Sequence, residues 1–204
     1  MEKLILPKPH LSWSQMSCWL SNPVRYRREY FENGNKLNSK YLTYGKNIAT
    51  MIETGQYKDL LPDLDVYDTP EFEIKCEVNG VPILSYLDSY DSKNNVFYEY
   101  KTGKIPWTKA KVQKHDQLTF YATALKWSIG KMPLYCDLIW IQTKDDAIEE
   151  SDFWRESGKI VNVTGRIINF HREFDEREIE RMENLILRVA TEISTAYQEY
   201  IKEI

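Results

Sequence analysis

Long apolar runs are missing from this chain of 204 residues, in which no stretch approaches the roughly 20 consecutive apolar residues that a membrane-spanning helix needs. The first residues, Met1 to His10, also lack the apolar core of a secretory signal peptide. We therefore expect a soluble protein of the cytoplasm that has no membrane partner.

Cysteine is scarce. Cys18, Cys76 and Cys136 are odd in number and far apart, which favours reduced thiols over a disulfide framework or a zinc site. Internal repeats and low-complexity linkers are missing as well. With 42% hydrophobic and 13% aromatic residues the composition is globular, and the length predicts a single α/β or α+β domain over residues 1–204.

An excess of positive charge is also missing, because 31 acidic residues outnumber 27 basic ones and the net charge is −4. The molecule as a whole therefore does not have the charge of a typical nucleic-acid-binding protein. Locally the balance differs. Five lysines lie between Lys101 and Lys114 with no acid among them, and Arg25, Arg27 and Arg28 form a second basic cluster. Such clusters either bind phosphates or form an ordinary solvated face.

Local sequence patterns predict an alternating set of helices and strands. Asn79-Gly80 is the strongest short turn signal, and it joins two strand-like stretches into a hairpin. The predicted strands cover residues 71–78, 81–90, 96–104, 134–142 and 160–170, and the predicted helices cover 12–32 with an interruption at Pro23, 42–54, 109–127 and a long final stretch from Asp175.

Two carboxylates and one ammonium group are predicted to converge in the middle of the chain. In the stretch 96–104, the strand period of two places Glu99 and Lys101 side by side on one face. Residues 91–95 suit a hairpin turn that brings Asp88 near Glu99. An acid and a base adjacent on a strand can hold a metal ion and position a water molecule.

This order of elements, carrying Asp88 and then Glu99-Tyr100-Lys101, resembles the PD-(D/E)XK nuclease superfamily, in particular its RecB-like branch and the related phage exonucleases. The resemblance spans roughly residues 11–125. It also includes the motifs Leu11-Ser12-Trp13-Ser14, Pro23-Val24-Arg25-Tyr26, Gly45 to Glu53, Thr102-Gly103-Lys104 and Gln117-Leu118-Thr119-Phe120-Tyr121. It implies a restriction-endonuclease-like core, in which helices flank a mixed central β-sheet.

The resemblance implies a metal-dependent DNA nuclease. Asp88 and Glu99 would be direct metal ligands, with the backbone carbonyl of Tyr100 as a third. Lys101 would orient or deprotonate the attacking water, or else form an ordinary salt bridge with Glu99. Glu53 would complete the site from its helix, or else be a solvated carboxylate, and Glu73 is a competing acid.

Gln117 and Tyr121 lie four residues apart and share a helix face. The resemblance implies that they face the substrate or support Lys101, whereas Tyr121 could also be a core aromatic residue. Contacts with the phosphates of nucleic acid are expected from a set of basic residues. This set comprises Arg25, Arg28, Lys104, Lys109 and Lys111.

Two departures from the family pattern bear on the cofactor. The position four residues after Gly45, where the branch often has a metal-binding histidine, is Ala49 here. The remaining oxygen ligands favour Mg²⁺ or Mn²⁺. The cysteines of the iron-sulfur members are also missing, since Asn22 precedes Pro23, so we expect no iron-sulfur cluster.

The function implied by the resemblance is that of an exonuclease in recombination, repair or phage DNA processing, in a bacterial or phage-infected cell. DNA is the expected partner, and the resemblance admits a single-strand annealing protein as a second one. A structure-specific endonuclease on the same fold is an alternative. A further alternative is an inactive, nuclease-derived nucleic-acid-binding or interaction protein.

Overall fold

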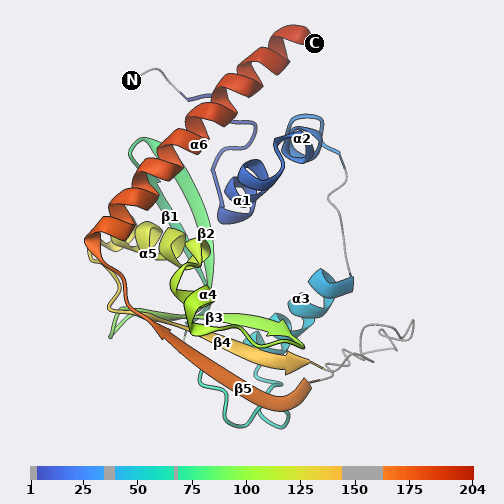
Figure 1. Ribbon diagram of the computed structural model, residues 1–204, viewed down its shortest axis with the longest axis vertical. Helices are drawn as coiled ribbons and strands as arrows, with labels where there is room; N and C mark the ends of the chain where they lie inside the picture. The colour runs from blue at the N-terminus through green and yellow to red at the C-terminus, as the bar shows by residue number, and fades with distance from the viewer. Residues whose placement is uncertain (1–3, 35–39, 67–68, 144–162) are drawn as a thin grey trace.

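The computed structural model describes residues 4–34, 40–66, 69–143 and 163–204. Within these residues five strands form one mixed sheet in the order β1-β2-β3-β4-β5 (Figure 1). The strands are β1 (Thr69–Val78), β2 (Val81–Asp91), β3 (Val96–Gly103), β4 (Cys136–Thr143) and β5 (Val163–Arg172). The helical segments are α1 (Trp13–Ser21), α2 (Pro23–Tyr26), the π-helical η1 (Arg27–Phe31), α3 (Lys40–Glu53), α4 (Lys109–Gln113), α5 (Asp116–Ile129) and α6 (Glu176–Glu203).

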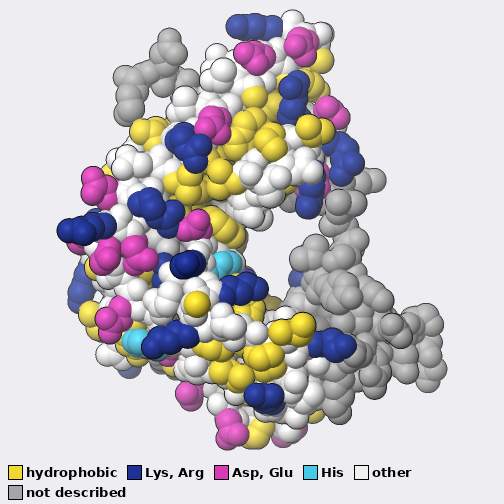
Figure 2. All heavy atoms as spheres, in the orientation of Figure 1, with side chains coloured by type: hydrophobic (Ala, Val, Ile, Leu, Met, Phe, Trp, Pro, Cys, Tyr) yellow, Lys and Arg dark blue, Asp and Glu magenta, His cyan; other side chains and the backbone are white. Residues whose placement is uncertain are grey.

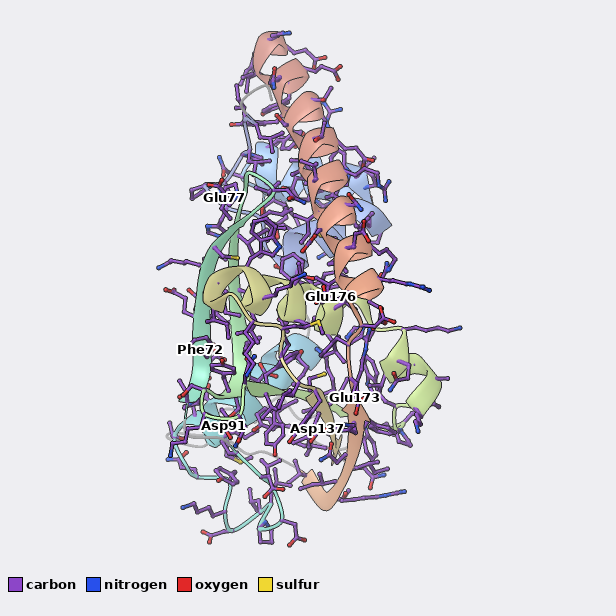
Figure 3. All side chains as sticks on the ribbon, turned by 90° about the vertical axis from the view of Figure 1, so that its left-hand side faces the viewer. Phe72, Glu77, Asp91, Asp137, Glu173 and Glu176 are labelled. Atoms are coloured by element: carbon purple, nitrogen blue, oxygen red, sulfur yellow. The ribbon has the colours of Figure 1, made fainter. Side chains whose placement is uncertain are left out.

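The β1–β2 hairpin turns where the sequence predicts. Asn79 and Gly80 both have positive φ, 49° and 81°, as a two-residue turn of this kind requires. Figure 3 shows Glu77 near this turn and Asp91 at the opposite end of the hairpin. There the Asp91 carboxylate accepts hydrogen bonds from the backbone N–H groups of Lys93 and Asn94, which closes the second turn.

Strands β3 and β4 are parallel, and the connection between them carries α4 and α5. Alternate residues of β4 face opposite sides of the sheet. Leu138 and Trp140 join the core cluster that contains residues of α1, α5 and α6, whereas Ile139 and Ile141 join the cluster that contains residues of α3. Helices therefore cover both sides of the sheet around β4, and the predicted fold class is confirmed.

The prediction of one continuous helix over 109–127 is wrong. Helix α4 ends at Gln113, and the backbone of His115 is extended, with φ −82° and ψ 100°, before α5 begins. The guanidinium of Arg172 donates to the backbone carbonyls of Val112 and His115, at 3.1 and 2.8 Å. A side chain distant in sequence thus satisfies carbonyl groups at the break, which local propensity cannot anticipate.

Replacing Arg172 with methionine is expected to lower the free energy of unfolding by about 3–5 kcal/mol, because the change leaves buried acceptors without a donor. Arg172 is 1% exposed and also donates to Thr119 Oγ1 and Glu178. Urea unfolding followed by circular dichroism measures the loss, and the exposed Arg188→Met variant serves as the control. Equal unfolding midpoints for the two variants would contradict this role.

Among the described residues, we find no helix that combines the length and the apolar composition needed to span a bilayer. The long final helix α6 begins as predicted, since the Asp175 side chain accepts a hydrogen bond from the Glu178 backbone and Glu178 returns one to the Asp175 backbone.

Candidate active site between β2 and β3

Strands β2 and β3 separate next to Asp88. The last paired residues are Ser89 and Tyr98. Asp88 then accepts a 2.7 Å hydrogen bond from the backbone N–H of Tyr100 across the opening. Burial raises the pKa of the Asp88 carboxyl well above its ordinary value, and the nearby charge of Glu99 raises it further, although the Tyr100 hydrogen bond opposes both. Keeping the Asp88 and Glu99 carboxylates close together therefore lowers the stability of the folded protein when both are charged.

Lys101 lies beside Glu99, as the strand period predicts. Its Nζ donates to Glu99 Oε1 at 2.6 Å and to Gln117 Oε1 at 2.9 Å. Glu99 is 3% exposed, and its other oxygen, Oε2, has no hydrogen-bond partner. Burial lowers the pKa of Lys101, but the charge and hydrogen bond of Glu99 outweigh burial, so the net pKa is raised. The amine is therefore a protonated donor at neutral pH.

Helix α5 carries Gln117, which accepts the hydrogen bond from Lys101, and Tyr121. Gln117 donates from Nε2 to the Tyr121 hydroxyl at 2.8 Å. Tyr121 is also a core residue, with its ring against Phe97 and Phe120. Burial raises the pKa of the Tyr121 hydroxyl, so it is a neutral hydrogen-bonding group at neutral pH. The two interpretations of Tyr121 are therefore compatible, because a core aromatic residue can support Gln117.

The acid on α3 has a partner that the sequence did not reveal. Glu53 is exposed at the end of α3, and it lies close enough to the carboxyl of Glu71 on β1 to raise the pKa of that group. In the β1–β2 register, Glu71 falls opposite Asp88. Burial raises the pKa of Glu71, and the charges of Glu53 and Glu99 add to the increase.

Glu73, the competing acid, lies in a different environment. It is exposed, accepts a hydrogen bond from Tyr86 and pairs with Lys75 at 2.6 Å. Glu71 was missed because its backbone has a φ of 49°, a left-handed conformation that is uncommon for a residue other than glycine. A strand pattern with period two contains no signal for such a residue.

Replacing Glu71 with glutamine is expected to raise the melting temperature of the metal-free protein at about pH 8 and to change it less at about pH 5. The native pKa of Glu71 is raised, so the native state holds this proton more tightly than the unfolded state does. Stability is therefore lost as pH rises through the native pKa, and the neutral amide avoids that loss. Thermal melts at both pH values measure it. The exposed Glu77→Gln variant is the control, and an unchanged pH dependence in Glu71→Gln would contradict the assignment.

The basic residues are distributed over several elements. Arg25 pairs with Glu29 at 2.7 Å. Lys111 lies over the ring of Trp107, with Nζ 3.9 Å from the ring centroid. Arg28, Lys104 and Lys109 are exposed. Figure 2 shows Lys and Arg side chains around the hollow in the centre of the face it presents.

The carboxylates that this site offers to a metal ion are those of Asp88 and Glu99. In the described portions of the chain, no group of three or more His, Cys, Asp or Glu residues is arranged to hold an ion. Asp88 and Glu99 are nevertheless close enough for the charge of Glu99 to raise the pKa of Asp88, and the unpartnered Oε2 of Glu99 is a buried oxygen that a cation would satisfy.

Comparison by sequence gives no relative, since no family model and no curated protein matches the chain. Comparison by structure finds solved proteins of similar fold. A candidate exonuclease from Eubacterium rectale matches with a TM-score of 0.54 and 13% identity, over 90% of this chain and 82% of that one. A phage-related exonuclease from Haemophilus somnus 129PT matches with a TM-score of 0.50 and 14% identity, over 93% of this chain and 81% of that one. At these identities the likeness shows the fold alone. The chain therefore shares its fold with these two solved structures, and the expected mixed sheet flanked by helices is confirmed.

Proposed function

We propose that the protein is a metal-dependent deoxyribonuclease that hydrolyses phosphodiester bonds, and that it works as an exonuclease in recombination, repair or phage DNA processing. The observation that carries this proposal is the network in which Lys101 joins Glu99 to Gln117, beside Asp88. Two proteins of similar fold that are named as exonucleases support the proposal. Because one fold hosts many activities, the activity is inferred from the residues of the site.

The residues of the site fit Mg²⁺ or Mn²⁺. Asp88 and Glu99 would supply carboxylate oxygens, and the backbone carbonyl of Tyr100 would supply a third ligand. A nearby positive charge would relieve both the raised pKa of Asp88 and the unpartnered Oε2 of Glu99. When bound, the ion would activate a water molecule and stabilise charge on the phosphoryl oxygens. Glu53 would contribute from α3, either through a water molecule or to a second ion.

Lys101 has the role of orienting the attacking water and offsetting the negative charge that develops on the phosphate. Because its pKa is raised, it acts as a donor and a charge rather than as the base. The Gln117 side-chain oxygen is a second acceptor for the amine besides Glu99, and the Tyr121 hydroxyl accepts from Gln117. The chain thus fixes one ammonium group beside the two acids.

DNA is the proposed partner, and a single-strand annealing protein is proposed on the family resemblance alone. The phosphates would be bound by Arg28, Lys104, Lys109 and Lys111, with Arg25 less available because of its pair with Glu29. Such contacts are electrostatic and carry little sequence preference.

Replacing Lys109 and Lys111 together with alanine is expected to weaken DNA binding more at low salt than at high salt. Each phosphate contact contributes about 0.9 to the slope of log K against log salt, so the slope should fall by about 1.8. Fluorescence anisotropy with labelled duplex, in the absence of divalent metal, measures it. A Lys93→Ala/Lys202→Ala pair removes the same charge from exposed positions outside α4, and an equal fall in slope for both pairs would contradict a specific role for α4.

The function is tested by incubating the parent protein with linear and with circular duplex DNA, with Mg²⁺ and with a chelator. Mg²⁺-dependent loss of linear DNA from its ends supports an exonuclease. Nicking of circles would favour a structure-specific endonuclease on the same fold. A parent protein that binds DNA but leaves every form intact would overturn the proposal in favour of a nuclease-derived binding protein.

A further inference from the structure

Arg166, near the start of β5, is an exposed basic residue outside the set of expected phosphate contacts. It follows Gly165, which has a φ of 83°. Its backbone N–H donates to Thr164 Oγ1 at 3.2 Å, and that hydroxyl donates to Gln142 Oε1 of β4 at 2.9 Å. Its guanidinium carbon lies 5.9 Å from the centroid of the Trp140 ring. The backbone of Arg166 is therefore tied to β4, and its cation lies over an aromatic ring.

Trp140 lies on the same face of the sheet as the Lys101 side chain. The two residues are partners in the parallel β3–β4 register, so their side chains point to the same side. In agreement, Lys101 donates to Gln117 of α5, and Trp140 packs in the core cluster that contains residues of α5. Figure 1 shows the ends of β3 and β4 beside the start of β5. Arg166 thus lies over the face that carries the proposed site.

The separation of the two cations suits one strand of DNA. Strand β5 is two strand spacings from β3, which is about 10 Å. A DNA strand carries one phosphate per about 3.4 Å of helix axis, so this separation corresponds to phosphates within about three nucleotides of each other. A strand with one phosphate beside Lys101 would therefore bring another to Arg166.

The indole N–H of Trp140 supplies a second, independent observation. Trp140 is 0% exposed, and its Nε1 has no hydrogen-bond acceptor among the residues that the structure describes. Such a buried, unpaired donor is uncommon in folded proteins. A Cβ atom at Gly103 would lie 3.7 Å from this Nε1, and no other described atom beyond the adjoining residues comes within 4 Å of that position. The absence of a side chain at Gly103 thus leaves space beside the N–H, where an oxygen atom could accept its hydrogen bond.

We propose that Arg166 binds a backbone phosphate of the DNA strand held at Lys101, and that Trp140 supports the guanidinium and donates its indole N–H to the same phosphate. The N–H groups of a guanidinium lie in its own plane, so stacking over a ring leaves them available to phosphate oxygens. The inference rests on the proposed function for its ligand, a nucleic-acid phosphodiester. Binding can nevertheless be measured without cleavage.

The salt dependence of DNA binding tests the role of Arg166. Fluorescence anisotropy with a labelled duplex in a chelator compares the parent protein with Arg166→Gln. One lost phosphate contact lowers the slope of log K against log salt by about 0.9, so the loss of affinity should be about threefold to fourfold larger at about 50 mM salt than at about 200 mM. Arg166→Lys, which keeps the charge, and Arg177→Gln, at an exposed position on α6, should retain the parental slope. A parental slope in Arg166→Gln would overturn the proposal, because Arg166 would then only cover Trp140.

The indole N–H gives a readout of its own. In a ¹H–¹⁵N spectrum, the Trp140 indole resonance is identified by its disappearance in Trp140→Phe. A saturating oligonucleotide in a chelator is expected to shift this resonance in the parent protein but not in Gly103→Ala, where the added methyl group fills the space beside Nε1. A resonance that the oligonucleotide leaves unmoved in the parent protein would overturn the role of Trp140. If the parent protein degrades no DNA while the slope and the resonance change as expected, the proposed nuclease function fails and the phosphate site stands.

Discussion

Replacing Lys101 with alanine is expected to lower kcat for DNA hydrolysis by roughly a hundredfold to a thousandfold while DNA affinity changes little. Lys101 is the ammonium group that the network fixes between Glu99 and Gln117. Its charge acts on the developing phosphate charge and on the attacking water, and most of this interaction exists in the transition state. A loss in kcat rather than in KM is therefore expected.

The measurement is the initial rate of linear duplex degradation in Mg²⁺ at several DNA concentrations, for the parent protein and Lys101→Ala. Lys202→Ala, at the exposed end of α6, removes the same charge far along the chain and should retain the parental rate. Circular dichroism shows whether Lys101→Ala is folded. A folded Lys101→Ala protein with the parental kcat would contradict the assignment.

Replacing Asp88 with asparagine is expected to have two opposite effects, namely loss of Mg²⁺-dependent activity by at least about a hundredfold and a higher melting temperature of the metal-free protein. The amide is nearly isosteric, and its oxygen can still accept from the Tyr100 N–H. It removes a metal ligand, and it also removes a charge that burial and Glu99 make unfavourable.

The sign of the stability change follows from the direction of the pKa shift. Because the native pKa of Asp88 is raised, the native state binds this proton more tightly than the unfolded state, and stability falls as pH rises through the native pKa. The gain from Asp88→Asn should therefore be larger at about pH 8 than at about pH 5. Thermal melts at both values with a chelator measure it.

Asp91→Asn is the matched control for Asp88→Asn, because it makes the same change three residues away. Hydrogen bonds from the Asn94 side chain and from backbone N–H groups hold the pKa of Asp91 below its ordinary value. Here the charged form is favoured in the native state, so the variant should melt at a lower temperature at neutral pH. An Asp88→Asn protein that is also less stable than the parent at about pH 8 would contradict the account of the acid pair.

Local signals predicted the parts of the fold that neighbouring residues determine. Asn79-Gly80 supplied the positive φ angles of the hairpin, and Asp175 supplied the cap of the final helix. The period of a strand placed Glu99 and Lys101 together. These features depend on contacts within a few residues, and sequence patterns describe such contacts well.

Features that depend on distant residues were not predicted. The predicted helix over 109–127 breaks at His115. There Arg172, which is 57 residues away in the sequence, donates hydrogen bonds to the backbone carbonyls of Val112 and His115. Glu71 has a left-handed backbone conformation and lies close enough to Glu53 for that acid to raise its pKa. Strand periodicity does not predict such a conformation.

Calorimetric titration with Mn²⁺ shows whether Asp88 and Glu99 hold a divalent cation beside Lys101. We expect saturable binding to the parent protein and to Glu73→Gln, whose carboxylate lies on exposed β1 paired with Lys75. Binding to Asp88→Asn and to Glu99→Gln should be at least about tenfold weaker. Equal Mn²⁺ affinity in all four proteins, or no binding to the parent protein, would contradict this cation site.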